Sequence, residues 1–110
     1  MARVAASVLA SALIRSVQAA GGNAALLARG DPMAGAILIL AYEKGANPRF
    51  VERGMGPEGA SALVPAGPDT FADEAAVAAY WAKRRSRDPD LWVIELDIPS
   101  AERFAAETLL

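Results

Sequence analysis

The spacing of apolar residues changes several times along the chain, and each change predicts an element of secondary structure. Over residues 4–20 apolar side chains recur every three or four positions and the opposite side is polar, as in an amphipathic helix. Gly21-Gly22 predicts its end, because glycine adopts the left-handed conformation of a helix cap. The uncharged run 4–14 also resembles the core of a signal peptide, but Arg15 and the polar side favour a helix of a globular domain.

Residues 91–98 show the alternating pattern of a β-strand. Trp92 and Ile94 fall on one face, and Glu95 and Asp97 fall on the other. We therefore expect Trp92 in the core, with its indole N–H bonded to a nearby carbonyl.

Three earlier segments also predict strands. The apolar runs 23–29 and 36–42 flank a turn rich in Gly, Asp and Pro at 30–35, which predicts a hairpin whose second strand is buried on both faces. Within the first run, Leu26–Arg29 is also compatible with a helical turn, since Ala and Leu favour helix. Residues 49–53 alternate as a third strand.

The next segment, 54–68, carries four Gly and three Pro, so we expect an irregular stretch with at most a brief strand at 61–64. A second helix is predicted from a cap at Asp69 or Thr70 to about Ser86. On this helix the alanine stripe is expected to pack on the sheet. The predicted packing side consists of Phe71, Ala75, Ala78 and Ala82, with Trp81 beside it.

These elements predict an α+β domain spanning residues 1–110, in the order α-β-β-β-α-β, with a short final helix at 100–107 as an optional addition. A meander followed by a helical crossover indicates a mixed, mostly antiparallel sheet. We expect the helices to pack on one face of that sheet.

The composition narrows the chemistry. The 110 residues include no cysteine and no histidine, which excludes a disulfide scaffold, a Cys/His zinc site, a Cys nucleophile and a triad that needs imidazole. A chain without cysteine fits a reducing cytoplasm. No cofactor or metal site is predicted, and no segment is long enough to span a membrane.

The net charge of −2 offers no overall attraction for nucleic acid, but the basic residues are concentrated near the end of the second helix. Tyr80 lies on the same side of that helix as three cations, an arrangement that suits a phosphate, a base or an acidic partner. The alternative is that these cations only offset the helix dipole. The candidate binding residues are Tyr80, Lys83, Arg84 and Arg87, joined by Arg49 and Arg53 of the third strand.

Asp88-Pro89-Asp90 follows this cluster directly. Two carboxylates at this spacing are compatible with a cation site or an acid/base pair. Asp before Pro is, however, ordinary turn chemistry, and we interpret the three residues as a structural turn between helix and strand.

Three groups of residues resemble a known family. They are the helix end Gln18-Ala19-Ala20-Gly21-Gly22, the strings 27–31 (L-A-R-G-D) and 35–38 (G-A-I-L), and the block Ala79-Tyr80 through Arg84-Arg85 to 88–93 (D-P-D-L-W-V). Together they resemble a bacterial family of small uncharacterised proteins, domain of unknown function 1491. Residues 43–68 depart from its pattern. The resemblance implies a compact bacterial cytoplasmic protein and no particular mechanism.

Without a catalytic constellation, the sequence favours a non-catalytic module that binds a protein partner or a second copy of itself. Binding of nucleic acid or a phosphate ligand through the basic cluster is the first alternative. An enzyme that uses only carboxylates with Arg and Tyr is the second.

Overall fold

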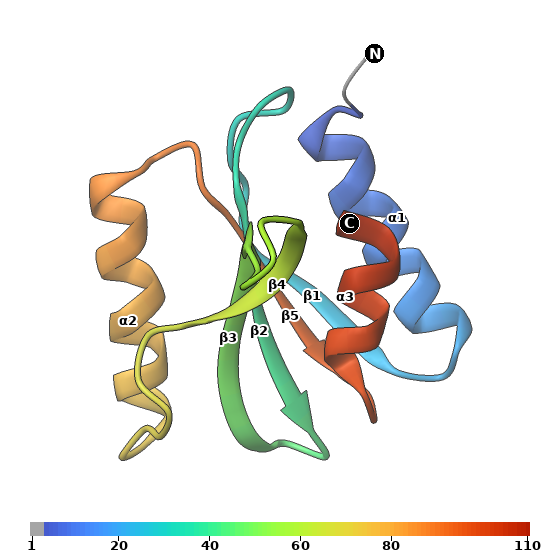
Figure 1. Cartoon of the computed structure of the whole chain (residues 1–110). Coiled ribbons are helices and arrows are strands. Elements are labelled where there is room, and N and C mark those ends of the chain that lie inside the picture. Colours follow the sequence, from blue (N-terminus) through green and yellow to red (C-terminus); the bar gives the residue numbers. More distant parts are fainter. Residues whose placement is uncertain (1–3) are drawn as a thin grey trace.

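The computed structural model describes residues 4–110, which form three helices and five strands (Figure 1). In chain order these are α1 (Ala6–Ala19), β1 (Asn23–Ala28), β2 (Ile37–Glu43), β3 (Ala46–Met55), β4 (Ser61–Ala66), α2 (Glu74–Arg87), β5 (Trp92–Asp97) and α3 (Ala101–Leu109). The predicted α+β class is confirmed, with a fourth strand added before α2 and the final helix present. No helix within residues 4–110 has the length and apolar character needed to cross a membrane.

The sheet is mixed, with strand order β1-β5-β2-β3-β4. Strands β2, β3 and β4 form an antiparallel meander, and β5 returns beside β2 in parallel. The predicted hairpin between the first two strands is wrong, because β5 inserts between them and pairs with β1 instead. β5 and β2 lie inside the sheet, and their side chains are the most buried of the five strands because both faces are covered.

Helices cover both faces of the sheet, so the prediction of a single covered face is wrong (Figure 1). On one side α1 and α3 pack over Ile39, Ile94 and Leu96. On the other side α2 packs over Leu40 and its neighbours. The alternation of β2 supplies both cores, because its odd and even positions point to opposite faces.

The face that α2 turns to the sheet also differs from the prediction. Val77 is buried, and Tyr80 and Trp81 are half-buried against the same cluster. Of the predicted packing side, Phe71 does pack on this cluster, but its three alanines, at 75, 78 and 82, are exposed. The bulky side chains bury more apolar area than alanine methyl groups, and this difference sets the rotation of the helix.

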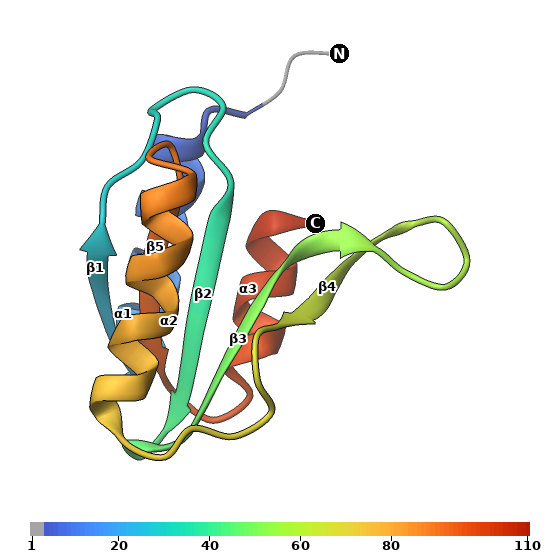
Figure 2. The ribbon, with the colours of Figure 1, turned by 90° about the vertical axis from the view of Figure 1, so that its left-hand side faces the viewer.

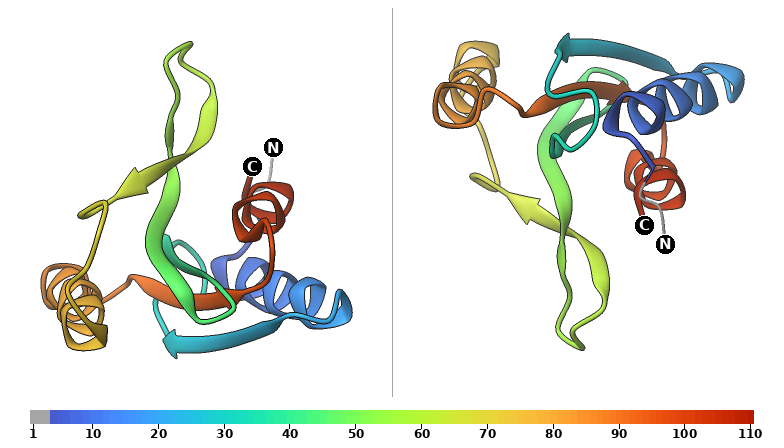
Figure 3. Two further views of the ribbon diagram at one scale, coloured as in Figure 1. Left: turned by 90° about the horizontal axis from the view of Figure 1, so that it is seen from below. Right: turned by 90° about the horizontal axis from the view of Figure 1, so that it is seen from above.

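Two boundaries are corrected as well. Residues 54–68 are not mainly irregular, because β3 continues to Met55 and β4 occupies Ser61–Ala66, joined by a tight turn (Figure 2). This hairpin projects well beyond the rest of the sheet (Figure 3). Helix α2 is capped by Asp73, whose carboxylate accepts a 2.8 Å hydrogen bond from the Ala76 N–H, rather than by Asp69 or Thr70.

Candidate interaction surfaces

Arg84 and Tyr80 of the predicted basic cluster are tied to the sheet. Two N–H groups of Arg84 donate to the carboxylate of Glu52 on β3, at 2.8 and 3.1 Å, and one of them also donates to the Tyr80 hydroxyl at 3.1 Å. The hydrogen bond to Glu52 raises the pKa of Arg84 above its usual value. Arg84 therefore fastens α2 to β3.

The remaining four candidates do not join a common surface. Lys83 and Arg87 are exposed on α2. Arg49 and Arg53 lie on the opposite face of β3, where Arg49 forms an ion pair with Glu102 of α3 at 2.7 Å. The six residues thus face two sides of the sheet, and the geometry gives no continuous basic patch for a nucleic acid.

The segment Asp88-Pro89-Asp90 forms a hydrogen-bonded turn. The Asp88 carboxylate accepts a bond of 3.1 Å from the Asp90 N–H, and the Asp88 carbonyl accepts one of 3.1 Å from Leu91. Arg85 donates to the carbonyls of Pro89 and Leu91. These contacts occupy the carboxylate of Asp88 and the backbone of Asp90, whose carbonyl accepts the Asp31 N–H at 3.0 Å.

The loop 30–35, which the sequence predicted only as the turn of a hairpin, organises one end of the molecule. The Asp31 carboxylate accepts hydrogen bonds from the N–H groups of Met33 and Ala34, and the Asp31 carbonyl accepts one from the Trp92 indole at 2.7 Å. Carbonyls of the same loop receive the first N–H groups of α1, since Ala6 donates to Met33 and Ser7 to Pro32.

Two glycines allow this loop to approach the backbone of Asp90 and the ring of Trp92 closely. A Cβ atom at Gly30 would stand 2.0 Å from the Asp90 carbonyl oxygen, and one at Gly35 would stand 2.2 Å from the same atom. Both would also press on the Trp92 ring. The strings 27–31, 35–38 and 88–93, which carry the family resemblance, therefore meet at one point in space.

Strand β1 forms one edge of the sheet and carries a register shift between Leu26 and Ala28, but neither a charge nor a proline protects it. Its six residues, 23–28, include no charge and no proline, whereas β4 at the other edge contains Pro65. Charged residues and prolines are the common means by which proteins prevent an edge strand from pairing with another chain. Leu26 on β1 is 43% exposed.

A hollow of about 220 Å³ lies beside this edge, between α1 and β1. Its floor is apolar, with Ala10, Ile14 and Leu26, and its lining also includes Arg15 and Arg29. Among residues 4–110, neither arginine has a carboxylate partner within ion-pair distance. Arg29 rests instead over the ring of Trp92, 5.5 Å from its centroid, in a cation–π contact.

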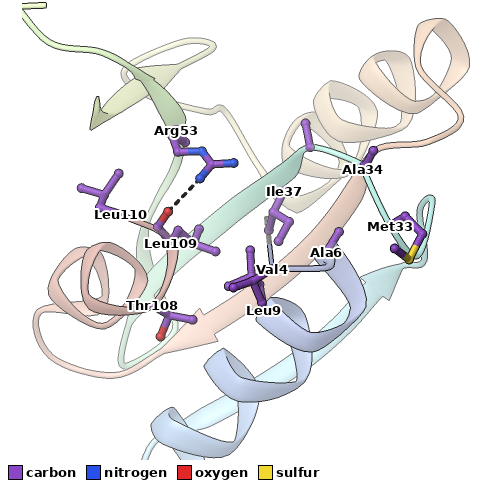
Figure 4. Close-up of a pocket in the computed structure, with 12 residues that line it drawn as sticks. Val4, Ala6, Leu9, Met33, Ala34, Ile37, Arg53, Thr108, Leu109 and Leu110 are labelled. Atoms are coloured by element: carbon purple, nitrogen blue, oxygen red, sulfur yellow. Dashed lines mark hydrogen bonds between the residues drawn. The ribbon is translucent and has the colours of Figure 1, made fainter. Parts of the chain in front are cut away.

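A larger groove, of about 760 Å³, opens on the same side of the sheet (Figure 4). It exists because β2 and β3 diverge: their pairing reaches Leu38 opposite Glu52, and beyond that point β3 stays paired only with β4. The end of α3 and the beginning of α1 form the other walls.

Apolar side chains dominate this groove, and Arg53 is its single cation among the described residues. One N–H of Arg53 donates to the Leu109 carbonyl at 3.1 Å, as Figure 4 shows. The most exposed apolar side chains on its rim are Val4, Met33 and Leu110, at 57%, 70% and 53%.

Acidic side chains gather on the α2 face near the opposite end of the sheet. Tyr42 donates to both carboxylate oxygens of Glu74, at 2.9 and 3.1 Å, and Asp97 accepts the N–H groups of Lys44 and Gly45 at the β2–β3 turn. Burial raises the pKa of Glu95, and the charges of Glu74 and Asp97 add to the effect. Asp97 thus stabilises a turn in which Lys44 has a positive φ of 52°.

Comparison with known proteins identifies relatives that share this fold. A crystal structure of a DUF1491 family protein from Caulobacter crescentus CB15 superimposes with a TM-score of 0.79 at 26% identity, covering 93% of this chain and 94% of that one. An NMR structure of a DUF1491 family protein from the same organism gives 0.77 at 26% identity, covering 94% of each chain.

The solution structure of protein Atu0922 from A. tumefaciens gives a TM-score of 0.69 at 26% identity, covering 88% of this chain and 87% of that chain. No curated protein matches the chain. The family profile described as a protein of unknown function (DUF1491) matches residues 4–106. The chain therefore belongs to the DUF1491 family, as the resemblance in its sequence predicted.

Proposed function

We propose that this protein is a non-catalytic interaction module of the bacterial cytoplasm that receives an extended segment of a partner protein along β1. The observation that carries the proposal is the uncharged, proline-free edge strand beside an apolar hollow. An extended peptide adds to such an edge through main-chain hydrogen bonds, and pockets for alternate side chains provide specificity. The absence of cysteine supports a reducing cytoplasm as the location, and the solved relatives come from bacteria.

The charges beside β1 favour a particular partner chemistry. Arg15 and Arg29 both line the hollow that Leu26 adjoins. A bound strand that points an aliphatic residue into the hollow would carry its next residues on the same face two positions away. Carboxylates at those positions would meet the two arginines, so the module selects an acidic segment with an aliphatic residue between the acids.

The same charges argue against pairing of β1 with β1 of a second copy. Antiparallel pairing of two identical edges would bring both copies of Arg15 and Arg29 to one face of the joined sheet. Strand β1 offers no carboxylate to offset them, and like charges brought together at an interface oppose binding. A partner with acidic residues is therefore favoured over self-association.

Selection from a displayed library of random 12-residue peptides on the full chain tests the proposal. We expect enriched peptides to combine aliphatic and acidic residues, and to slow hydrogen exchange of the β1 amides. In the variant that joins Arg15→Glu to Arg29→Glu, the Kd should rise at least tenfold, and peptides with Lys in place of the acids should then bind better. Arg87→Glu, at an exposed cation of α2, is the matched control and should leave the Kd unchanged.

Failure to enrich any peptide would overturn the proposal, as would peptides that bind the charge-reversed variant as tightly as the original chain. Thermal melting of each variant establishes that it is folded. A dimer detected by sedimentation, in which hydrogen exchange of the β1 amides is also slowed, would contradict the argument from charge. The occupant of β1 would then be a second copy of the chain and not an acidic partner.

A further inference from the structure

The groove between α1, the diverging strands β2 and β3, and the end of α3 has the properties of a small-molecule site. Its volume of about 760 Å³ falls within the 300–1,000 Å³ range of typical ligand sites. Leu9, Ile37 and Leu109 are among the aliphatic side chains that line it. It lies on a different part of the surface from the β1 edge, so its occupation does not depend on the function proposed above.

Arg53 supplies the cation of the groove, and Thr108 adds a hydroxyl to its lining. A guanidinium has five N–H donors, and within residues 4–110 Arg53 uses one of them, for the Leu109 carbonyl. It forms no ion pair with a described carboxylate, in contrast to Arg49 and Arg84 on the same strand and on α2. The remaining donors are available to an acceptor that enters the groove.

From this geometry we propose that the groove binds a small amphiphile with an aliphatic chain and a single carboxylate head. The chain would lie against Leu9 and Ile37, and the carboxylate would accept hydrogen bonds from Arg53 in the planar arrangement that guanidinium and carboxylate favour. Arg53 is exposed, but the aliphatic side chains beside it lower the local dielectric constant and so strengthen that pairing relative to one with no apolar neighbours.

A purely structural role of Arg53 makes a different prediction. Its bond to Leu109 satisfies a carbonyl in the last turn of α3, where a cation also offsets the helix dipole. If that were its whole role, replacing Arg53 would change the melting temperature but not the selectivity for an acid over an uncharged molecule of the same length.

Titration of the full chain with decanoate, followed by backbone amide NMR shifts, tests the proposal, with decanol as the uncharged probe and acetate as the probe without a chain. We expect decanoate to shift the amides around residues 34–37 and 108–110 and to bind at least fivefold more tightly than decanol, whereas acetate should not bind. Arg53→Gln should remove the preference for decanoate without weakening decanol. Ala34→Phe, which fills the groove at an exposed position, should weaken both.

Lys83→Gln is the matched control, because Lys83 is an exposed cation remote from the groove, and it should leave both affinities unchanged. Equal binding of decanoate and decanol to the original chain would overturn the proposal. So would shifts that map elsewhere, failure of both probes to bind, or an unchanged preference for the acid in Arg53→Gln. Binding of the test peptides at β1 is measured separately, so either proposal can fail alone.

Discussion

The indole N–H of Trp92 donates a 2.7 Å hydrogen bond to the backbone carbonyl of Asp31, 61 residues away in the chain. This bond joins β5 to the loop that receives the first N–H groups of α1. Trp92 is 2% exposed, so loss of its donor would leave the Asp31 carbonyl with only the longer 3.3 Å hydrogen bond from the Gly35 N–H, in a largely dry setting. The bond therefore connects the core to the end of the molecule where both proposed sites lie.

Trp92→Phe removes this donor and part of the ring volume. We expect a loss of about 2–3 kcal/mol in the free energy of unfolding, from the lost hydrogen bond and the cavity together. Urea unfolding followed by circular dichroism measures it. Trp81→Phe is the control, since Trp81 is half-buried and makes no side-chain hydrogen bond among the described contacts, and a smaller loss is expected there. Equal losses would contradict a special role for the bond to Asp31.

Gly30→Ala and Gly35→Ala test the close approach of the loop to β5. The added methyl group would stand 2.0 Å from the Asp90 carbonyl oxygen in Gly30→Ala and 2.2 Å from it in Gly35→Ala. That oxygen accepts a hydrogen bond from the Asp31 N–H, so it is held in place. We expect each substitution to lower the free energy of unfolding by about 2–3 kcal/mol or more.

Gly56→Ala is the matched control for these variants, because its methyl group would come no closer than 3.2 Å to the Ala62 side chain and 3.5 Å to the Ala60 carbonyl oxygen. Thermal melting should place Gly56→Ala close to the original chain and the two loop variants well below it. A melting temperature for Gly30→Ala equal to that of Gly56→Ala would show that the loop can move away from Asp90 at little cost.

The pattern of the sequence predicted where most elements lie because helix and strand periodicities are local properties. It could not predict which strands pair: the runs 23–28 and 37–43 are neighbours in the chain, yet β5 lies between them. Placing an apolar strand in the centre of a sheet depends on burial of both of its faces, which is a property of the whole fold.

The prediction of which side of α2 packs on the sheet failed for a different reason. Alanine favours helix whether it is buried or exposed, so a stripe of alanines does not identify the packed side. The useful signal was the spacing of the bulky residues Val77, Tyr80 and Trp81, which recur at three and four positions. With that rotation Arg84 also turns to the sheet and finds Glu52, a partner 32 residues distant that no local pattern reveals.

The ion pair between Arg84 and Glu52 should contribute measurable stability, because both side chains are largely shielded, at 29% and 26% exposure. A double-mutant cycle of Arg84→Ala and Glu52→Ala should give a coupling energy of about 1 kcal/mol. The exposed pair of Arg103 and Glu107, at 67% and 65% exposure and 3.8 Å, should give about 0.3 kcal/mol or less in the same experiment. Coupling energies of the same size would contradict a fastening role for Arg84.

The carboxyl group of Glu95 makes the stability of the fold depend on pH and lowers it when the group is ionised. Burial, Glu74 and Asp97 raise the pKa of Glu95 in the folded chain, so the folded state holds its proton more tightly than the unfolded state does. Stability from this group is therefore complete below the ordinary pKa of glutamate and is lost as the pH rises through the raised value.

We expect Glu95→Gln to raise the melting temperature at pH 7 and to leave it nearly unchanged at pH 3, where Glu95 is protonated. Glu58→Gln, at an exposed glutamate in the β3–β4 turn, is the control and should have little effect at either pH. A Glu95→Gln variant that is less stable at pH 7 would show that the ionised carboxylate is needed, and would reverse the sign of this argument.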